Sequence, residues 1–189
     1  MRDYAPGCRV AAVVKANAYG HGLVTVAGAL AGADAFGVAR IEEATSLRKA
    51  GCRARVLLLE GVRDRADLEV AAREEFEPFL HQAWQLDLLE AWRGAGALRA
   101  WLKVDTGMHR LGFGPAEAAD AARRLAACRA LQQPAGLATH LAASEDPDRA
   151  ATEAQLAAFA AATAGLPGER SIANSAALIA WPESRADWV

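Results

Sequence analysis

The feature that most constrains the fold is a regular alternation of short apolar runs with longer segments of helical character. Several runs, such as VAAVV at 10–14 and VLLLE at 56–60, show no polar alternation, which suits strands that are buried on both faces of a sheet. The candidate strands lie at residues 10–14, 35–39, 56–60, 76–81, 99–105, 135–142 and 170–175. The pattern therefore predicts a parallel sheet covered by helices.

The segments between these runs have the chemistry of helices. Residues 41–51 carry Glu42 and Glu43 in the first turn and basic residues in the last, and Gly51 ends the segment. Further candidate helices lie at residues 64–74, 83–92, 115–128 and 151–163. Because strand and helix alternate with short connections, the sheet is expected either to close into an eight-stranded barrel or to open into a doubly wound sheet.

The two sheet types differ in the phosphate-binding turns they use. The chain has no Gly-x-Gly-x-x-Gly turn after the first strand and no phosphate loop that ends in Gly-Lys-Ser/Thr. The open, nucleotide-binding sheet therefore lacks support. We predict an α/β fold, a parallel (β/α)8 TIM-type barrel that is incomplete, with about seven βα units in one domain over residues 1–189.

Composition argues against several classes of function. A net charge of -2 offers no basic excess for nucleic acid, and no stretch approaches the roughly 20 apolar residues that a membrane helix needs. Cys8, Cys52 and Cys128 are widely spaced, and the histidines lack the spacing of metal ligands. We therefore expect a cytoplasmic protein that binds no nucleic acid, membrane or metal.

The first candidate functional residue is Lys15, at the C-terminal end of the first strand, where the reactive groups of a parallel barrel lie. It follows an apolar run and precedes a polar, glycine-containing segment at 17–22. Partial loss of water there disfavours the ammonium form, and a neutral amine can attack an aldehyde to form a Schiff base. The alternative is a lysine that only extends from the strand end into solvent.

The later strand ends present further candidates. The strand at 99–105 delivers Lys103 and Asp105, and a turn then presents Arg110, whose planar guanidinium can hold a phenolate or a carboxylate. Alternatively, Arg110 pairs with Asp105 and fastens the loop. His140 ends another strand, where it is either a core residue or a site residue.

Asn174 and Ser175 follow the seventh strand and precede an alanine-rich helical segment. A hydroxyl and the backbone amides of a helix N-terminus can bind an anion. The same dipeptide is also common at helix caps, so both interpretations stay open.

Four segments resemble the alanine racemases. They are VVKANAYGHG at 13–22, WLKVDTGMHRLGF at 101–113, GLATHLAASED at 136–146 and SIANSAALIAWPESRADWV at 171–189. The resemblance covers essentially the whole chain, which has about half of the family's usual length. It implies pyridoxal 5′-phosphate as the cofactor, alanine as the substrate and a homodimer for the full-length protein.

The resemblance also implies which residues hold the cofactor. Lys15 would bind pyridoxal phosphate covalently and move a proton on one face of the substrate. Tyr19 and Ser175 would contact the cofactor phosphate, with Asn174 beside them, and His140 would lie against the pyridine ring.

Two further roles follow from the resemblance. Arg110 would contact cofactor or substrate, and Lys103, which is sometimes carbamylated in the family, would orient it. The second base of the family is a tyrosine of the partner subunit's C-terminal domain, and neither Tyr4 nor Tyr19 lies in such a segment. The eighth strand is expected just after Val189, so this chain is expected to be a fragment that is inactive alone.

The implied activity is interconversion of L-alanine and D-alanine, for peptidoglycan supply or alanine catabolism. One alternative is a related barrel that binds the same cofactor for homeostasis or decarboxylation, and another is a barrel that has lost its site. The residues after Lys15 favour the racemase over the first alternative, and the joint presence of Lys15, Arg110, His140 and Ser175 argues against the second.

Overall fold

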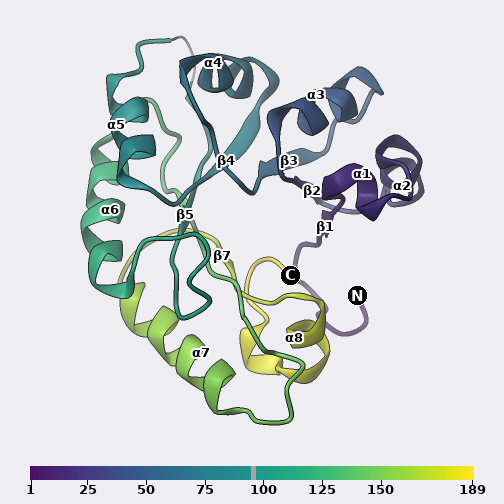
Figure 1. The fold of residues 1–189 in the computed structure, drawn as a ribbon, viewed down its shortest axis with the longest axis vertical. Helices are drawn as coiled ribbons and strands as arrows, with labels where there is room; N and C mark the ends of the chain where they lie inside the picture. Colours follow the sequence, from purple (N-terminus) through teal and green to yellow (C-terminus); the bar gives the residue numbers. More distant parts are fainter. Residues whose placement is uncertain (95–96) are drawn as a thin grey trace.

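The computed structural model describes residues 1–94 and 97–189 and shows one sheet of parallel strands in sequence order. The strands are β1 (Ala11–Val13), β2 (Ala35–Val38), β3 (Arg55–Leu58), β4 (Phe76–Leu80), β5 (Trp101–Lys103), β6 (Gly136–Ala138) and β7 (Arg170–Ser171). The sheet curls into an incomplete barrel (Figure 1). Six of these strands lie within runs expected from the sequence, β3 begins one residue before its expected run, and the predicted fold class is confirmed.

Helices cover the outer face of the curled sheet (Figure 1). They are α2 (Leu23–Ala29), α3 (Ile41–Lys49), α4 (Arg65–Glu74), α5 (Ala83–Ala91), α6 (Pro115–Ala127), α7 (Ala150–Ala162) and α8 (Ser175–Ala180), with a short 3-10 turn, η1 (Pro182–Ser184). The expected helices α3 to α7 are confirmed, whereas α2 carried no recognised signal. None of the helices in the described ranges is long and apolar enough to span a membrane.

Alternation along the strands separates two layers of core. Phe79 of β4 is paired with Trp101 of β5, and their rings stack with centroids 5.6 Å apart inside the barrel. The intervening Leu80 and Leu102 pack outward with the residues that the helices bury. Side chains alternate between the two faces of a strand. Counting in steps of two from an inward-facing residue such as Trp101 therefore gives the other residues of that strand that face the barrel interior.

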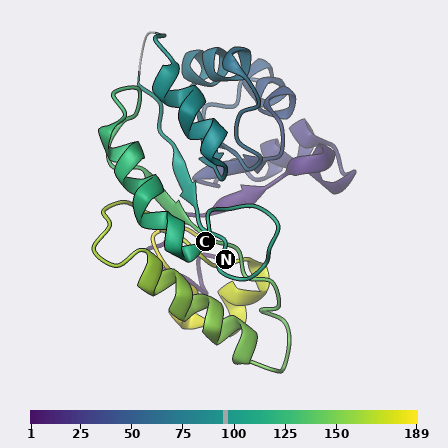
Figure 2. The same cartoon turned by 60° about the vertical axis from the view of Figure 1, so that its left-hand side comes forward.

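Trp188 joins the two edges of the sheet. It forms isolated parallel bridges to Ser171 of β7 and to Arg9, just before β1, and Val189 accepts a hydrogen bond from the Ala11 amide at 2.8 Å. Figure 2 shows the two ends of the chain side by side at this seam. The expectation that the eighth strand begins only after Val189 is therefore wrong, because residues 187–189 already bridge the two edges.

The register around the sheet also has the stagger of a TIM barrel. Starting from a residue of β1, the paired residues can be traced from strand to strand around the barrel and through Trp188 back to the β1 segment. The trace ends about eight residues nearer the N-terminus than it began. The same barrel geometry places all strand C-termini, and hence the predicted site residues, at one end of the molecule.

Candidate active site

The predicted site begins with an unusual turn after β1. Ala16, Asn17, Ala18 and Tyr19 have φ values of 53 to 55°, so these four residues of the segment α1 (Lys15–Tyr19) are left-handed. For residues other than glycine this conformation costs roughly 1–2 kcal/mol each. Backbone strain of this kind persists where surrounding contacts impose it and is concentrated at functional sites.

Tertiary contacts hold this turn in place. The Asn17 side chain accepts a hydrogen bond from the Leu23 amide at 2.8 Å, and the Glu43 carboxylate accepts from the amides of Asn17 at 3.3 Å and Ala39 at 2.9 Å. The turn therefore leaves Lys15 half-buried at the strand end and directs Tyr19 outward, with 62% of that residue exposed.

Lys103 lies at the end of β5 with its amine half-buried. Its Nζ donates to the carbonyl of Val104 at 3.0 Å and, more weakly, to that of Leu111 at 3.4 Å. Burial and the positive charge of Arg110 lower the pKa of Lys103 to about 8, against the opposing effect of Asp105. An appreciable fraction of this amine is therefore neutral near neutral pH.

Asp105 does not bind Arg110 within the described residues. One oxygen of its carboxylate accepts hydrogen bonds from the amides of Gly107 and His109, each at 3.0 Å, and so shapes the turn after β5. The alternative in which Arg110 pairs with Asp105 is therefore not observed, and Arg110 is exposed. Its guanidinium remains accessible to a ligand.

His140 follows β6, two residues beyond the inward-facing Ala138, which is paired with Lys103. Burial lowers the pKa of His140 to about 4, and the positive charges of Arg110, Lys103 and Lys15 add to this effect. The imidazole is therefore neutral at physiological pH. Lys15, Lys103 and His140 all lie at or just after the C-terminal ends of strands, and therefore at the same end of the barrel.

Gln155 of α7 organises the backbone beside His140 and carried no signal in the sequence. Its amide nitrogen donates to the carbonyl of His140 and to the hydroxyl of Thr106, both at 3.2 Å, and its oxygen accepts from the Ala142 amide at 2.8 Å. Thr106 in turn bonds Thr139 at 2.8 Å. This network links the ends of β5 and β6.

Asn174 caps α8 with a fully engaged side chain. Its oxygen accepts from the Ala177 amide at 2.9 Å and from the Ser144 hydroxyl at 2.7 Å, while its nitrogen donates to the Leu141 carbonyl at 3.2 Å. Ser175 follows it and is exposed. Asn174 thus supports the segment geometrically, and Ser175 has the freer side chain.

This set of groups fits pyridoxal phosphate chemically. Lysine and arginine side chains can balance the charge of a phosphate or a carboxylate, and a neutral imidazole can pack against an aromatic ring without the cost of burying a charge. Lys15, at the end of β1, supplies a primary amine beside them. The residues can therefore hold an anionic aromatic aldehyde.

The known proteins to which this chain is similar include alanine racemases. The chain is 47% identical over 189 residues to an alanine racemase of Shewanella baltica, covering 100% of this chain and 53% of that protein. The crystal structure of biosynthetic alanine racemase from Pseudomonas aeruginosa superposes with a TM-score of 0.94 at 37% identity, over 100% of this chain and 52% of that one. Alanine racemase from Bartonella henselae with covalently bound pyridoxal phosphate has a TM-score of 0.88 at 30% identity, over 100% and 56% of the two chains.

The chain spans about half the length of the curated relatives it matches. Residues 1–189 match the protein family described as "Alanine racemase, N-terminal domain". With the barrel, the lysine at the end of β1 and the relatives in agreement, the chain belongs to the family of alanine racemase N-terminal domains.

Proposed function

We propose that this chain is the cofactor-binding barrel of a pyridoxal-phosphate-dependent alanine racemase, which interconverts L-alanine and D-alanine. The observation that carries the proposal is that Lys15, Lys103 and His140 lie at or just after the C-terminal ends of β1, β5 and β6, with Arg110 on the turn after β5. The relatives named alanine racemase and the Bartonella henselae structure with covalently bound pyridoxal phosphate support it.

Each of the predicted site residues has its own role in holding the cofactor. Lys15 would attach it covalently, Tyr19 and Ser175 would contact its phosphate, and His140 would pack against its ring. Asn174 holds the start of α8 beside Ser175 through its cap. When bound, the cofactor supplies an electron sink for the α-carbon of the amino acid.

The substrate is held and deprotonated by side chains of the same rim. The Arg110 guanidinium binds the carboxylate of alanine, and Lys103 positions Arg110. The Lys15 Nζ takes or returns the α-proton on one face of the substrate. Racemisation also needs a proton donor on the opposite face, which we assign to a tyrosine of the partner subunit in a homodimer.

The cysteines agree with a cytoplasmic location. Cys8, Cys52 and Cys128 are free thiols, as is usual in a reducing compartment.

Covalent attachment of the cofactor can be tested residue by residue, because the chain has only three lysines, Lys15, Lys49 and Lys103. The protein is incubated with pyridoxal phosphate, reduced with borohydride, digested and analysed by mass spectrometry. The pyridoxyl group is expected on the peptide that contains Lys15, and Lys15→Ala should remove it. Lys49→Ala, a change at an exposed lysine of α3, is the matched control.

Attachment at Lys103 or at none of the three lysines would contradict the proposal. Attachment at Lys15 in a full-length protein that does not interconvert the alanine enantiomers would favour a cofactor-storage or decarboxylase-type barrel instead.

A further inference from the structure

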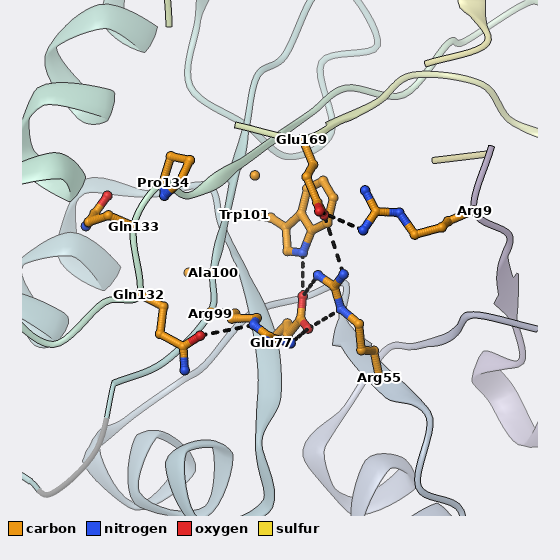
Figure 3. Close-up of a pocket in the computed structure, with 11 residues that line it drawn as sticks. Arg9, Arg55, Glu77, Arg99, Ala100, Trp101, Gln132, Gln133, Pro134 and Glu169 are labelled. Carbon is orange, nitrogen blue, oxygen red and sulfur yellow. Dashed lines mark hydrogen bonds and ion pairs between the residues drawn. The ribbon is translucent and has the colours of Figure 1, made fainter. Parts of the chain in front are cut away.

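A second candidate site lies at the opposite end of the barrel from Lys15. A cavity of about 440 Å³ opens at the N-terminal ends of the strands, and its charged lining residues come from segments far apart in the sequence (Figure 3). They are Arg9, Arg55, Glu77, Arg99 and Glu169, with the indole of Trp101 behind them. This end of a TIM barrel is remote from the face that carries catalysis.

Both carboxylates in this cavity are already bound by protein groups. Glu77 accepts hydrogen bonds from two nitrogens of Arg55 and, at 2.9 Å, from the Trp101 indole. Glu169 accepts from the Trp188 indole at 2.8 Å and lies 2.7 Å from Arg9. Burial would raise the pKa of Glu169, but these partners hold it below its ordinary value, so the carboxylate stays charged. Neither carboxylate is free to attract a cation.

Arg99 is the surplus positive charge of the cavity. Its nearest carboxylate oxygen, on Glu77, is 4.0 Å away and already engaged by Arg55. The Arg99 Nε donates to Gln132 at 3.1 Å, and Gln132 in turn donates to the Ala97 carbonyl at 3.0 Å, so the guanidinium is held at the rim. Within the part of the chain that the structure describes, no hydrogen bond engages its two terminal nitrogens.

Arg9 lies on the other side of the same cavity (Figure 3). One of its terminal nitrogens binds Glu169, and its guanidinium carbon lies 4.5 Å from the ring centroid of Trp188. Arg55 packs on Trp188 at the same distance, so stacking and ion pairing orient both guanidinium groups before any ligand arrives. A preorganised arginine fork matches the oxygens of phosphate and carboxylate groups.

We propose that this cavity binds a small oxyanion, either inorganic phosphate or a small carboxylic acid, with Arg99 as the principal ligand and Arg9 as the second. Three arginines face two carboxylates, which leaves one positive charge for the anion. The anion would link the segment before β5 to the segment before β1 and so stabilise the barrel where its seam closes.

The test uses the protein saturated with pyridoxal phosphate, so that the cofactor site does not compete for anions. Binding of phosphate and of citrate is measured by calorimetry and by thermal unfolding at constant ionic strength, with chloride as the reference salt. One of the two anions is expected to bind at one site and to raise the Tm. The anion that binds with the higher affinity shows whether the cavity takes a phosphate or a carboxylate group.

Variants separate this site from other cationic surfaces. Arg99→Gln should weaken anion binding by about tenfold or more, since a charge-assisted hydrogen bond is lost. Arg99→Lys keeps the charge but lacks the planar fork, so its anion affinity should lie between those of the unmodified protein and Arg99→Gln. Arg65→Gln, at an exposed arginine of α4, removes the same charge elsewhere and should bind as the unmodified protein does.

Equal affinity in Arg99→Gln and the unmodified protein would overturn the proposal, because the anion would then bind elsewhere. Stabilisation by phosphate and citrate no greater than that by chloride would overturn it as well.

Discussion

Arg110 acts electrostatically on Lys103: burial and the charge of this arginine together lower the pKa of the Lys103 amine to about 8. Lys103 ends β5, and Arg110 lies on the turn that follows, which Asp105 shapes through its bonds to the amides of Gly107 and His109. A partly neutral lysine at this position is a nucleophile as well as a hydrogen-bond donor. The pair can therefore be probed chemically without any assay of turnover.

Removal of the Arg110 charge should raise the pKa of Lys103. In the unmodified protein, labelling of Lys103 by an amine-reactive reagent should rise with pH around a midpoint of about 8. In Arg110→Gln the midpoint should move to higher pH, because the positive neighbour no longer disfavours the ammonium form. Mass spectrometry of the labelled peptides over a pH series measures both midpoints, with the exposed Lys49 as the internal reference. An unchanged midpoint would show that burial alone perturbs Lys103.

His140 should make the protein sensitive to acid. Burial lowers its pKa from 6.5 to about 4 in the folded protein, so between these values the unfolded chain binds more protons than the folded chain. Stability therefore rises with pH over this range and falls on acidification. Between pH 7 and pH 5 the unmodified protein should lose roughly 1 kcal/mol more than His140→Gln, after allowance for the ring's partial exposure.

Urea unfolding of both proteins at the two pH values measures this difference. Equal losses would mean that His140 is protonated in the folded state at pH 5 and that its ring is not desolvated.

Much of the fold could be predicted because its signals are local. Buried strands such as VLLLE and the charge pattern of residues 41–51 each occupy a few consecutive positions. The positions of Lys15 and His140 could be predicted for the same reason, since each lies two residues beyond the end of a strand. The sequence shows which residues lie at strand ends, and the barrel fold then brings the ends of different strands close together.

The features that were missed depend on contacts between residues that are not neighbours in the sequence. The left-handed turn at Ala16–Tyr19 contains no glycine, and Leu23 and Glu43 hold it from outside. The closure by Trp188 joins residues at opposite ends of the chain. Such contacts leave no periodicity or spacing that a single sequence reveals.

Trp188 should be a large contributor to stability. It is 1% exposed, bridges the two edges of the sheet, donates to Glu169 and packs between Arg9 and Arg55. Trp188→Ala should lower the free energy of unfolding by about 3–5 kcal/mol, because it removes a buried indole and leaves the Glu169 carboxylate short of a donor.

Chemical denaturation measures the effect, and Trp84→Ala serves as the matched control. Trp84 on α5 is 45% exposed, so its loss should change stability by only about 0.5 kcal/mol. Similar losses in the two variants would mean that the seam at Trp188 contributes nothing beyond a surface contact.

Asn17 should link the strained turn to the reactivity of Lys15. Its side chain accepts from the Leu23 amide at 2.8 Å, and asparagine tolerates its φ of 55° better than most residues do. Asn17→Ala loses both advantages and should destabilise the protein by roughly 1–2 kcal/mol, while Asn17→Gly loses only the hydrogen bond and should cost less. Ala16→Gly relaxes a neighbouring strained residue and keeps the hydrogen bond, so it should be neutral or stabilising.

Cofactor attachment distinguishes a positioning role from a purely structural one. If the turn places Lys15, the rate at which borohydride fixes pyridoxal phosphate on Lys15 should fall in Asn17→Ala under conditions where the variant is fully folded, and Asn17→Gly should recover part of it. An unchanged rate in a destabilised Asn17→Ala protein would mean that the turn serves stability alone and that β1 by itself places the amine.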